Sequence, residues 1–229
     1  MVTDALFYTV ITSTAYSFER TYGLTPWQTG LCFISYGSGC IVATVVNGML
    51  LNHDYRLVSR RLERKRAEGG AEGAADHARW LEKARKDGND LSGFPIERAR
   101  LRSMPYAVFG LVLPTIAYGW LVDKAVHLAA PLVFQFFIGL AATMQFNMTS
   151  TLLIDLFPGR GASAIAANNL SRCLVGAGGT AVVVPIIKAL GEGWAFTLLS
   201  LITLCFAPLL VLEYKHGQRF RRKRGEKSQ

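Results

Sequence analysis

Few residues in this sequence could build an enzyme active site or a disulfide framework. Its 229 residues include four cysteines and four histidines. The histidines are scattered and show neither metal-ligand spacing nor a nucleophile–base motif. The cysteines lie in apolar stretches without metal-ligand or disulfide spacing, so we expect buried free thiols at Cys32, Cys40, Cys173 and Cys205. We therefore predict no enzyme activity, no metal site and no bound cofactor.

Acidic residues are also in short supply, with 16 Asp and Glu against 25 Lys and Arg. In a soluble protein this balance would suggest a nucleic-acid partner. Here the basic residues lie between and after apolar runs, which is the pattern of membrane topology. We therefore expect no nucleic acid partner. The first residues lack a basic region and a small-residue cleavage site, so we also expect no removable signal peptide.

What the sequence does contain is long apolar runs, and 51% of its residues are hydrophobic. About 20 apolar residues suffice to cross a bilayer as a helix. We predict an all-α membrane protein, embedded in the lipid bilayer, with six transmembrane helices at residues 1–18, 29–51, 105–122, 131–154, 162–190 and 194–214. The predicted organisation is two helices in 1–51, a charged loop in 52–104, four helices in 105–214 and a basic tail in 215–229.

The charge distribution predicts which way the chain crosses the membrane. Residues 52–104 hold 13 of the Lys and Arg residues, the 155–161 hinge holds one and the tail holds seven. Placing all three segments in the cytoplasm puts 21 of the 25 basic residues there, so we expect both termini to be cytoplasmic. Residues 56–87 favour a helix, and the segment could be a solvated connector or a docking site.

Polar residues recur at helical spacing inside two of these spans. Asp4, Tyr8, Thr12 and Tyr16 are four residues apart, as are Gln135, Gly139, Thr143 and Asn147. Polar groups are costly in lipid, so they should face other helices or a watery cavity. The first set could line such a cavity or pack between helices, and both alternatives are kept. A third series, Ser35, Gly39, Ala43 and Asn47, is typical of close helix approach.

Three stretches of the sequence carry a family resemblance. They read TYGLTPWQTGLCFISYGSGC at 21–40, NGMLLNHDYR at 47–56 and FPGRGASAIAANNLSRCLVGA at 157–177. They resemble the carboxyl-terminal half of a major facilitator superfamily transporter, most of all the fungal twelve-span drug:proton antiporters that include quinidine-resistance and dityrosine exporters. The second stretch departs from the family signature, because Asn52 stands where an acid is usual and Asp54 is the nearby carboxylate.

The resemblance implies a three-plus-three inverted repeat with the first and fourth spans facing the cavity. It implies a substrate cavity lined by Tyr8, Thr12, Tyr16, Gln135, Thr143 and Asn147. It also implies gating by charged residues at the loop ends, with Asp54, Arg56, Asp155 and Arg172 as candidates. Arg56–Asp155 is the pairing we favour, and the alternative is that Asp155 only caps its turn.

The function implied is export of small organic or cationic compounds across the plasma membrane, coupled to the proton gradient. Aromatic rings and amides suit amphipathic and cationic substrates. The family pattern has twelve spans, so the chain is expected to be a fragment that needs an amino-terminal six-helix half. The alternative is a non-transporting membrane fragment that associates with a full-length transporter and modulates it.

Overall fold

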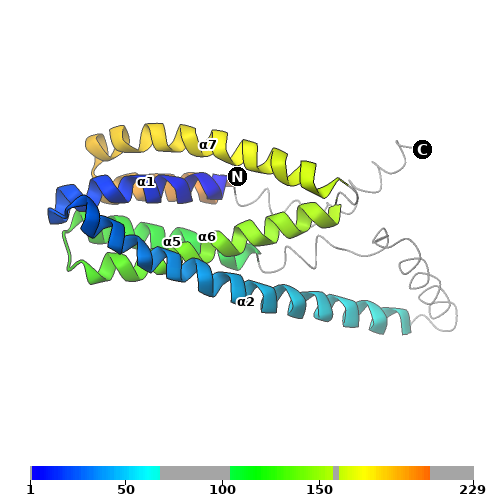
Figure 1. Cartoon of the computed structure of the whole chain (residues 1–229). Coiled ribbons are helices and arrows are strands. Elements are labelled where there is room, and N and C mark those ends of the chain that lie inside the picture. Colours follow the sequence, from blue (N-terminus) through cyan, green and yellow to red (C-terminus); the bar gives the residue numbers. More distant parts are fainter. Residues whose placement is uncertain (1, 68–103, 157–159, 207–229) are drawn as a thin grey trace.

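The computed structural model describes residues 2–67, 104–156 and 160–206, and all their regular structure is helical. The helices are α1 (Val2–Tyr22), α2 (Pro26–Ala67), α5 (Met104–Asp123), α6 (Ala129–Leu156), α7 (Gly161–Leu190) and an unlabelled helix Glu192–Phe206. They lie side by side as an elongated bundle (Figure 1). The predicted all-α class is confirmed for this part of the chain.

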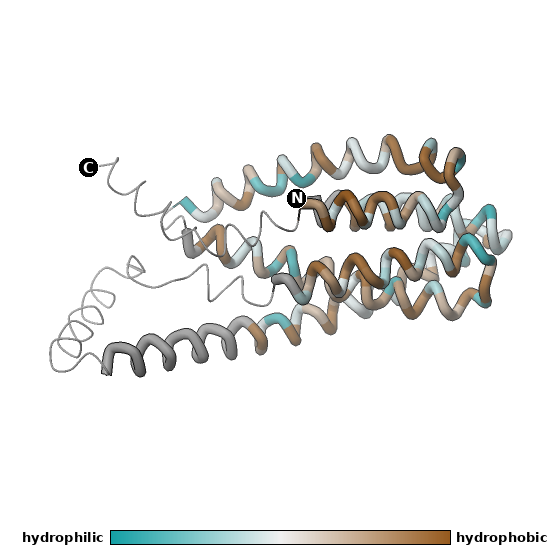
Figure 2. The backbone as a smooth tube through the Cα atoms, turned by 180° about the vertical axis from the view of Figure 1, so that it is seen from behind, coloured by the Kyte–Doolittle hydropathy of each residue, from teal (hydrophilic) through white to brown (hydrophobic). Residues whose placement is uncertain are grey.

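Four of these helices contain a stretch long and apolar enough to cross a membrane: Pro26–Leu50, Tyr106–Asp123, Ala129–Ile154 and Gly161–Leu190. Figure 2 shows the apolar residues along the middles of the helices and hydrophilic ones at the turns. Helix α1 has 21 residues but carries many hydroxyl side chains. The helix Glu192–Phe206 is too short to qualify within the described range. Six spans therefore remain a prediction.

Helix α2 runs past the end of its apolar part. Pro26 occupies the first turn, where its missing N–H costs nothing, and the Thr25 backbone N–H donates to Gln28 Oε1 at 3.0 Å, as in a capping box. The apolar stretch ends at Leu50, near the predicted position, but the helix continues to Ala67. The charged segment thus begins inside a helix, as the helical preference from Arg56 onward predicts.

Helix α1 also ends later than its predicted span. The hydropathy pattern ends the span at Phe18, but the helix continues to Tyr22. Gly23 then adopts a φ of +62°, and the Leu24 N–H bonds back to the Phe18 carbonyl. This left-handed glycine satisfies the last carbonyls of the helix, which explains the sharp turn before α2.

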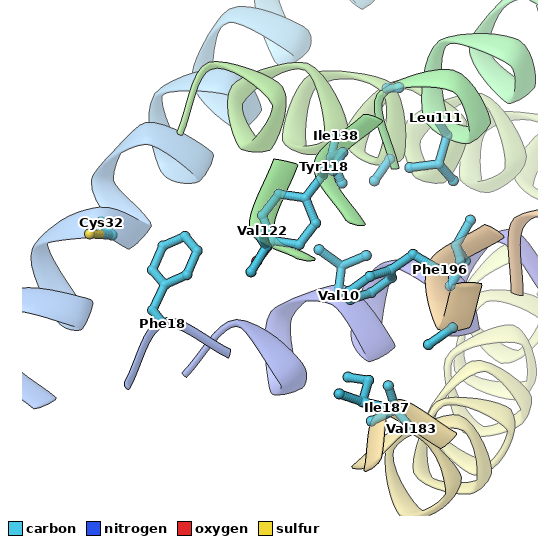
Figure 3. Close-up of a cluster of buried hydrophobic side chains, with 14 residues drawn as sticks. Val10, Phe18, Cys32, Leu111, Tyr118, Val122, Ile138, Val183, Ile187 and Phe196 are labelled. Carbon is cyan, nitrogen blue, oxygen red and sulfur yellow. The ribbon is translucent and has the colours of Figure 1, made fainter. Parts of the chain in front are cut away.

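The buried apolar core lies where α1, α5, α6, α7 and the helix Glu192–Phe206 meet (Figure 3). Tyr118 of α5 packs on Phe196 with ring centroids 5.4 Å apart and on Phe18 of α1 at 6.3 Å. Val10 and Ile138 approach the same cluster from α1 and α6. The core therefore joins the beginning of the chain to its last described helix.

Helices α2 and α6 pack along each other, as the small-residue series in α2 predicts. Gly39, Ala43 and Asn47 are buried, Gly39 lies against the backbone of α6, and the Ser35 hydroxyl donates to the Leu132 carbonyl at 2.7 Å. Further pairings are α5 with α6, α1 with α7, and, more lightly, α6 with α7 and α1 with α2, α5 and α6.

The four cysteines are free, as predicted, but only Cys32 is buried. Cys40 is half-buried, and Cys173 and Cys205 are exposed on the bundle surface. The prediction of burial was wrong for the last two because an apolar position in a membrane helix can face lipid instead of a protein core.

Candidate functional site

Helix α1 buries a row of hydroxyl side chains that lies one position along the sequence from the predicted series Tyr8, Thr12 and Tyr16. Its buried polar residues are Thr9, Ser13, Thr14 and Ser17. The Ser13 and Thr14 hydroxyls donate to carbonyls of their own helix, at 2.7 and 2.8 Å. Such bonds within the helix let hydroxyls enter a low-dielectric interior. In contrast Thr12 is exposed, and Tyr8 and Tyr16 are half-buried.

Gln135 belongs to this buried polar layer. It is 2% exposed, and its Nε2 donates to Thr14 Oγ1 at 3.1 Å. The same Thr14 oxygen lies 3.1 Å from the Tyr118 hydroxyl, so one threonine links α1, α5 and α6. The predicted cavity role of Gln135 is untested by these contacts and stays a prediction. Sequence reasoning missed Thr14 and Tyr118. The four-residue spacing of Thr9, Ser13 and Ser17 could have indicated the buried polar face of α1, but it marks neither of these two residues.

Glu192 is the buried carboxyl among the described side chains, with 6% of its surface exposed. It precedes the predicted sixth span. Burial raises its pKa above the ordinary value of 4.5, and Asp123 adds to this, whereas the Ser17 hydroxyl and the Arg20 guanidinium act in the opposite direction. Its Oε2 atom has no hydrogen-bond partner in the described part of the chain. Sequence analysis treated this residue only as part of a turn.

Tyr16 lies between two cations at the same end of the bundle. Arg20 Nη1 donates to its hydroxyl at 3.1 Å, and Lys188 Nζ lies 5.9 Å from its ring centroid. The ring thus joins the carboxyl end of α1 to the carboxyl end of α7 through cation–π attraction.

Arg172 lies against two aromatic rings in the interior of α7. Its guanidinium carbon is 4.5 Å from the Phe146 ring centroid of α6 and 5.8 Å from that of Tyr8 on α1. Gly176 makes room for Tyr8, because a Cβ there would lie 2.9 Å from the Tyr8 ring. Sequence reasoning assigned Tyr8 to the cavity and Arg172 to the charge pairs. The structure brings the two together in what we call the arginine site: Tyr8, Phe146 and Arg172.

Two more of the predicted cavity residues have described side chains. Thr143 and Asn147 are half-buried on α6. The side chains of Asp54, Arg56 and Asp155 lie outside the described residues, so the Arg56–Asp155 pair stays a prediction. Among the side chains that the structure does describe, no cluster of His, Cys, Asp or Glu could hold a metal ion.

Comparison with known proteins places the chain beside fungal transporters. It is 38% identical over 215 residues to "Citrate exporter 1" of Aspergillus niger, covering 94% of this chain and 38% of that protein. It is 32% identical over 222 residues to "MFS-type transporter phiD" of a fungal species, covering 96% of this chain and 31% of the relative. It is 33% identical over 144 residues to "Quinidine resistance protein 3" of Saccharomyces cerevisiae, covering 62% of this chain and 21% of that protein.

The chain thus spans less than two-fifths of the length of these three relatives. No family model and no solved structure matches it. The similarity to the first two nevertheless runs through nearly all of this chain, including the helices that carry the polar layer and the arginine site.

Proposed function

We propose that this chain, a homologue of fungal transporters of the major facilitator superfamily (MFS) along 94% of its length, forms part of a transporter for small organic compounds. The similarity to proteins named as transporters is the observation that carries the proposal. The four apolar helices support it, because they are long enough to place the buried polar groups inside a bilayer. The protein is accordingly an integral membrane protein and not an enzyme.

The helix pairing supports a three-plus-three inverted repeat. Such a repeat would exchange α1 with α6, α2 with α7 and α5 with the helix Glu192–Phe206. Under this exchange, the packing of α2 on α6 corresponds to the packing of α7 on α1, and both contacts are extensive. The lighter packing of α1 on α2 corresponds in the same way to the packing of α6 on α7, which is also observed. With this repeat, α1 and α6 are the helices that face the substrate path.

We further propose outward transport across the plasma membrane, with both termini in the cytoplasm. The name of the Aspergillus relative, an exporter, supports this direction, and the basic segments support this orientation. The relatives are more than twice as long as the matched region, which supports a second set of helices as the opposite wall of the path.

Glu192 supports coupling to the proton gradient. Burial makes its carboxyl hold a proton more strongly than an exposed glutamate does. It lies beside Arg20, whose charge favours the ionised form. Burial favours the protonated carboxyl and Arg20 favours the ionised one, so a movement of the surrounding helices could make Glu192 take up or release a proton. Glu192 is therefore our candidate for the coupling group.

The proposal is tested by citrate export from a yeast strain that lacks close relatives. The chain is expressed alone and fused behind the amino-terminal part of the Aspergillus citrate exporter that it does not match. We expect export from the fusion and none from the chain alone, because one half cannot enclose a substrate path. A fusion that reaches the plasma membrane but exports neither citrate nor quinidine would contradict the proposal.

The second candidate function is modulation of a full-length transporter. The observation that favours it is the exposed apolar face of α2, with Ile34, Ile41, Val45 and Met49, since such a face can pack on a helix of another membrane protein. Expression of the chain beside the full-length exporter tests it. This function predicts that the chain co-purifies with the exporter and changes its rate, while the fusion protein stays inactive.

A further inference from the structure

We propose that the arginine site binds a carboxylate group of the transported compound, so that the substrates are organic anions. This inference rests on the proposed transport function and specifies its substrate class. It departs from the cationic substrates that the sequence led us to expect. Its basis is the surroundings of Arg172: aromatic rings on the guanidinium, a buried Nε donor without a described partner, and no described acid nearby.

The rings of Phe146 and Tyr8 hold the guanidinium without using its hydrogen-bond donors. A guanidinium carries five N–H groups, and cation–π contacts engage the charge through the ring faces. The Nε atom of Arg172 is buried and has no partner within the described part of the chain. An arginine in a membrane interior normally pairs with an acid or with backbone carbonyls. The site therefore holds a cation in place while leaving donor capacity for a ligand.

Helix spacing places two further buried polar atoms without described partners about one turn from residues of the arginine site. Asn169 Oδ1 belongs to the residue three positions before Arg172 on α7, and Ser150 Oγ to the residue four positions after Phe146 on α6. Residues three or four apart share a helix face, and α6 packs against α7. A ligand carboxylate could accept from Arg172 and Ser150, and a hydroxyl next to it could donate to Asn169.

No acid with a described side chain can neutralise Arg172. Those acids are Glu19 in the last turn of α1, Asp123 at the end of α5 and Glu192 just after α7, and these three helix ends lie at one end of the bundle (Figure 1). Eighteen residues of α7 separate Arg172 from Leu190, or about 27 Å at 1.5 Å per residue. The side chains of Asp4 and Asp155 are outside the description. Asp4 lies one helical turn before Tyr8 on α1, which makes it the competing partner that a test must address.

Binding of citrate to the purified chain in lipid nanodiscs tests the inference. Citrate presents several carboxylates, and triethyl citrate presents the same skeleton without charge. We expect citrate to bind and triethyl citrate and the cation tetraphenylphosphonium not to. Arg172→Gln should weaken citrate binding at least about tenfold, and Arg172→Lys should restore only part, since an ammonium lacks the planar fork. Lys124→Gln, at an exposed position in the turn between α5 and α6, is the matched control and should bind as the parent does.

Further variants keep the result interpretable. If Arg172→Gln does not fold, Ser150→Ala and Asn169→Ala remove single polar groups and should each weaken citrate binding severalfold. Asp4→Asn should strengthen citrate binding if that acid competes, and leave it unchanged otherwise. Citrate binding that is absent from both the parent and Asp4→Asn, or equal in the parent and Arg172→Gln, would overturn the inference. So would equal binding of triethyl citrate.

Binding and transport can fail separately. Citrate binding that depends on Arg172, in a protein whose fusion exports nothing, would leave the arginine site standing and remove the transport proposal. Export of quinidine but not citrate by the fusion, unchanged in Arg172→Gln, would retain transport and overturn the carboxylate site.

Discussion

Gly39 of α2 and Gly139 of α6 meet at one helix crossing, each against the backbone of the other helix. A Cβ on Gly39 would collide with the Phe136 carbonyl oxygen, and a Cβ on Gly139 would lie 2.6 Å from the Tyr36 carbonyl oxygen. Neither contact can be relieved by rotating a side chain. The two glycines thus set how closely α2 and α6 approach, and through α6 they position Gln135 and the arginine site.

Replacing either glycine with alanine should therefore loosen this crossing. We expect Gly39→Ala and Gly139→Ala each to reduce the free energy of unfolding by about 1–3 kcal/mol, the usual cost of overpacking. Unfolding of the purified protein in detergent measures this. Gly37→Ala is the control, because a Cβ there meets nothing within 4 Å and alanine favours a helix. Equal stability of all four proteins would show that the crossing is not close-packed.

The bond between Gln135 and Thr14 should contribute measurable coupling between α6 and α1. We expect a coupling free energy of about 0.5–1.5 kcal/mol from a double-mutant cycle with Gln135→Leu and Thr14→Val. Thr12→Val serves as the control, since Thr12 is exposed two residues away and should show no coupling to Gln135. Additive effects of the Gln135 and Thr14 changes would argue against the buried layer.

Glu192 should make stability depend on pH. Its pKa is raised in the folded state, so folding binds the proton more strongly. The protein is then at full stability below the ordinary glutamate pKa and loses stability as pH rises through the raised value. Glu192→Gln cannot ionise and should escape this loss. We expect its melting temperature, relative to the parent, to be higher at pH 8 than at pH 4.

The exposed Glu19 provides the comparison for that pH series. Glu19→Gln removes an exposed carboxyl from the same end of the bundle, so it controls for the loss of one acidic group. If Glu192→Gln behaves in the same way as Glu19→Gln, the carboxyl of Glu192 is not buried in the folded protein and its proposed coupling role fails.

Water access should distinguish a substrate path from a lipid-facing surface on α1. After the native cysteines are replaced, we expect a water-borne thiol reagent to label Thr12→Cys, because that face lines the proposed path. Val10→Cys should be protected, since Val10 is 2% exposed in the core. Protection of both positions would mean that Thr12 faces lipid.

Local patterns in the sequence predicted most of the helix bundle. Apolar runs and the breakers between them gave the positions of the helices, and the four-residue series of Ser35, Gly39 and Ala43 indicated the face that packs on α6. These features depend on periodicity within one helix. The hydropathy pattern missed the ends of α1 and α2 because caps and charged side chains extend a helix beyond its apolar part.

The candidate site was harder to predict because its contacts join distant parts of the chain. Thr14 meets Tyr118 across 104 residues, and which hydroxyl of α1 faces α5 depends on helix rotation that periodicity alone does not give. Similarly, nothing in the sequence around Glu192 marks it as buried. Its burial follows from packing of the last helix on α5, where Gly119 lies directly against Phe196.

Transport of citrate into or out of liposomes is the most direct test of the central claim. The fusion protein is purified, reconstituted with internal radiolabelled citrate and subjected to an imposed proton gradient. We predict citrate efflux that an uncoupler slows and that Arg172→Gln abolishes, while Lys124→Gln leaves it intact. Efflux no faster than from protein-free liposomes, with a fusion that is folded and inserted, would contradict the account.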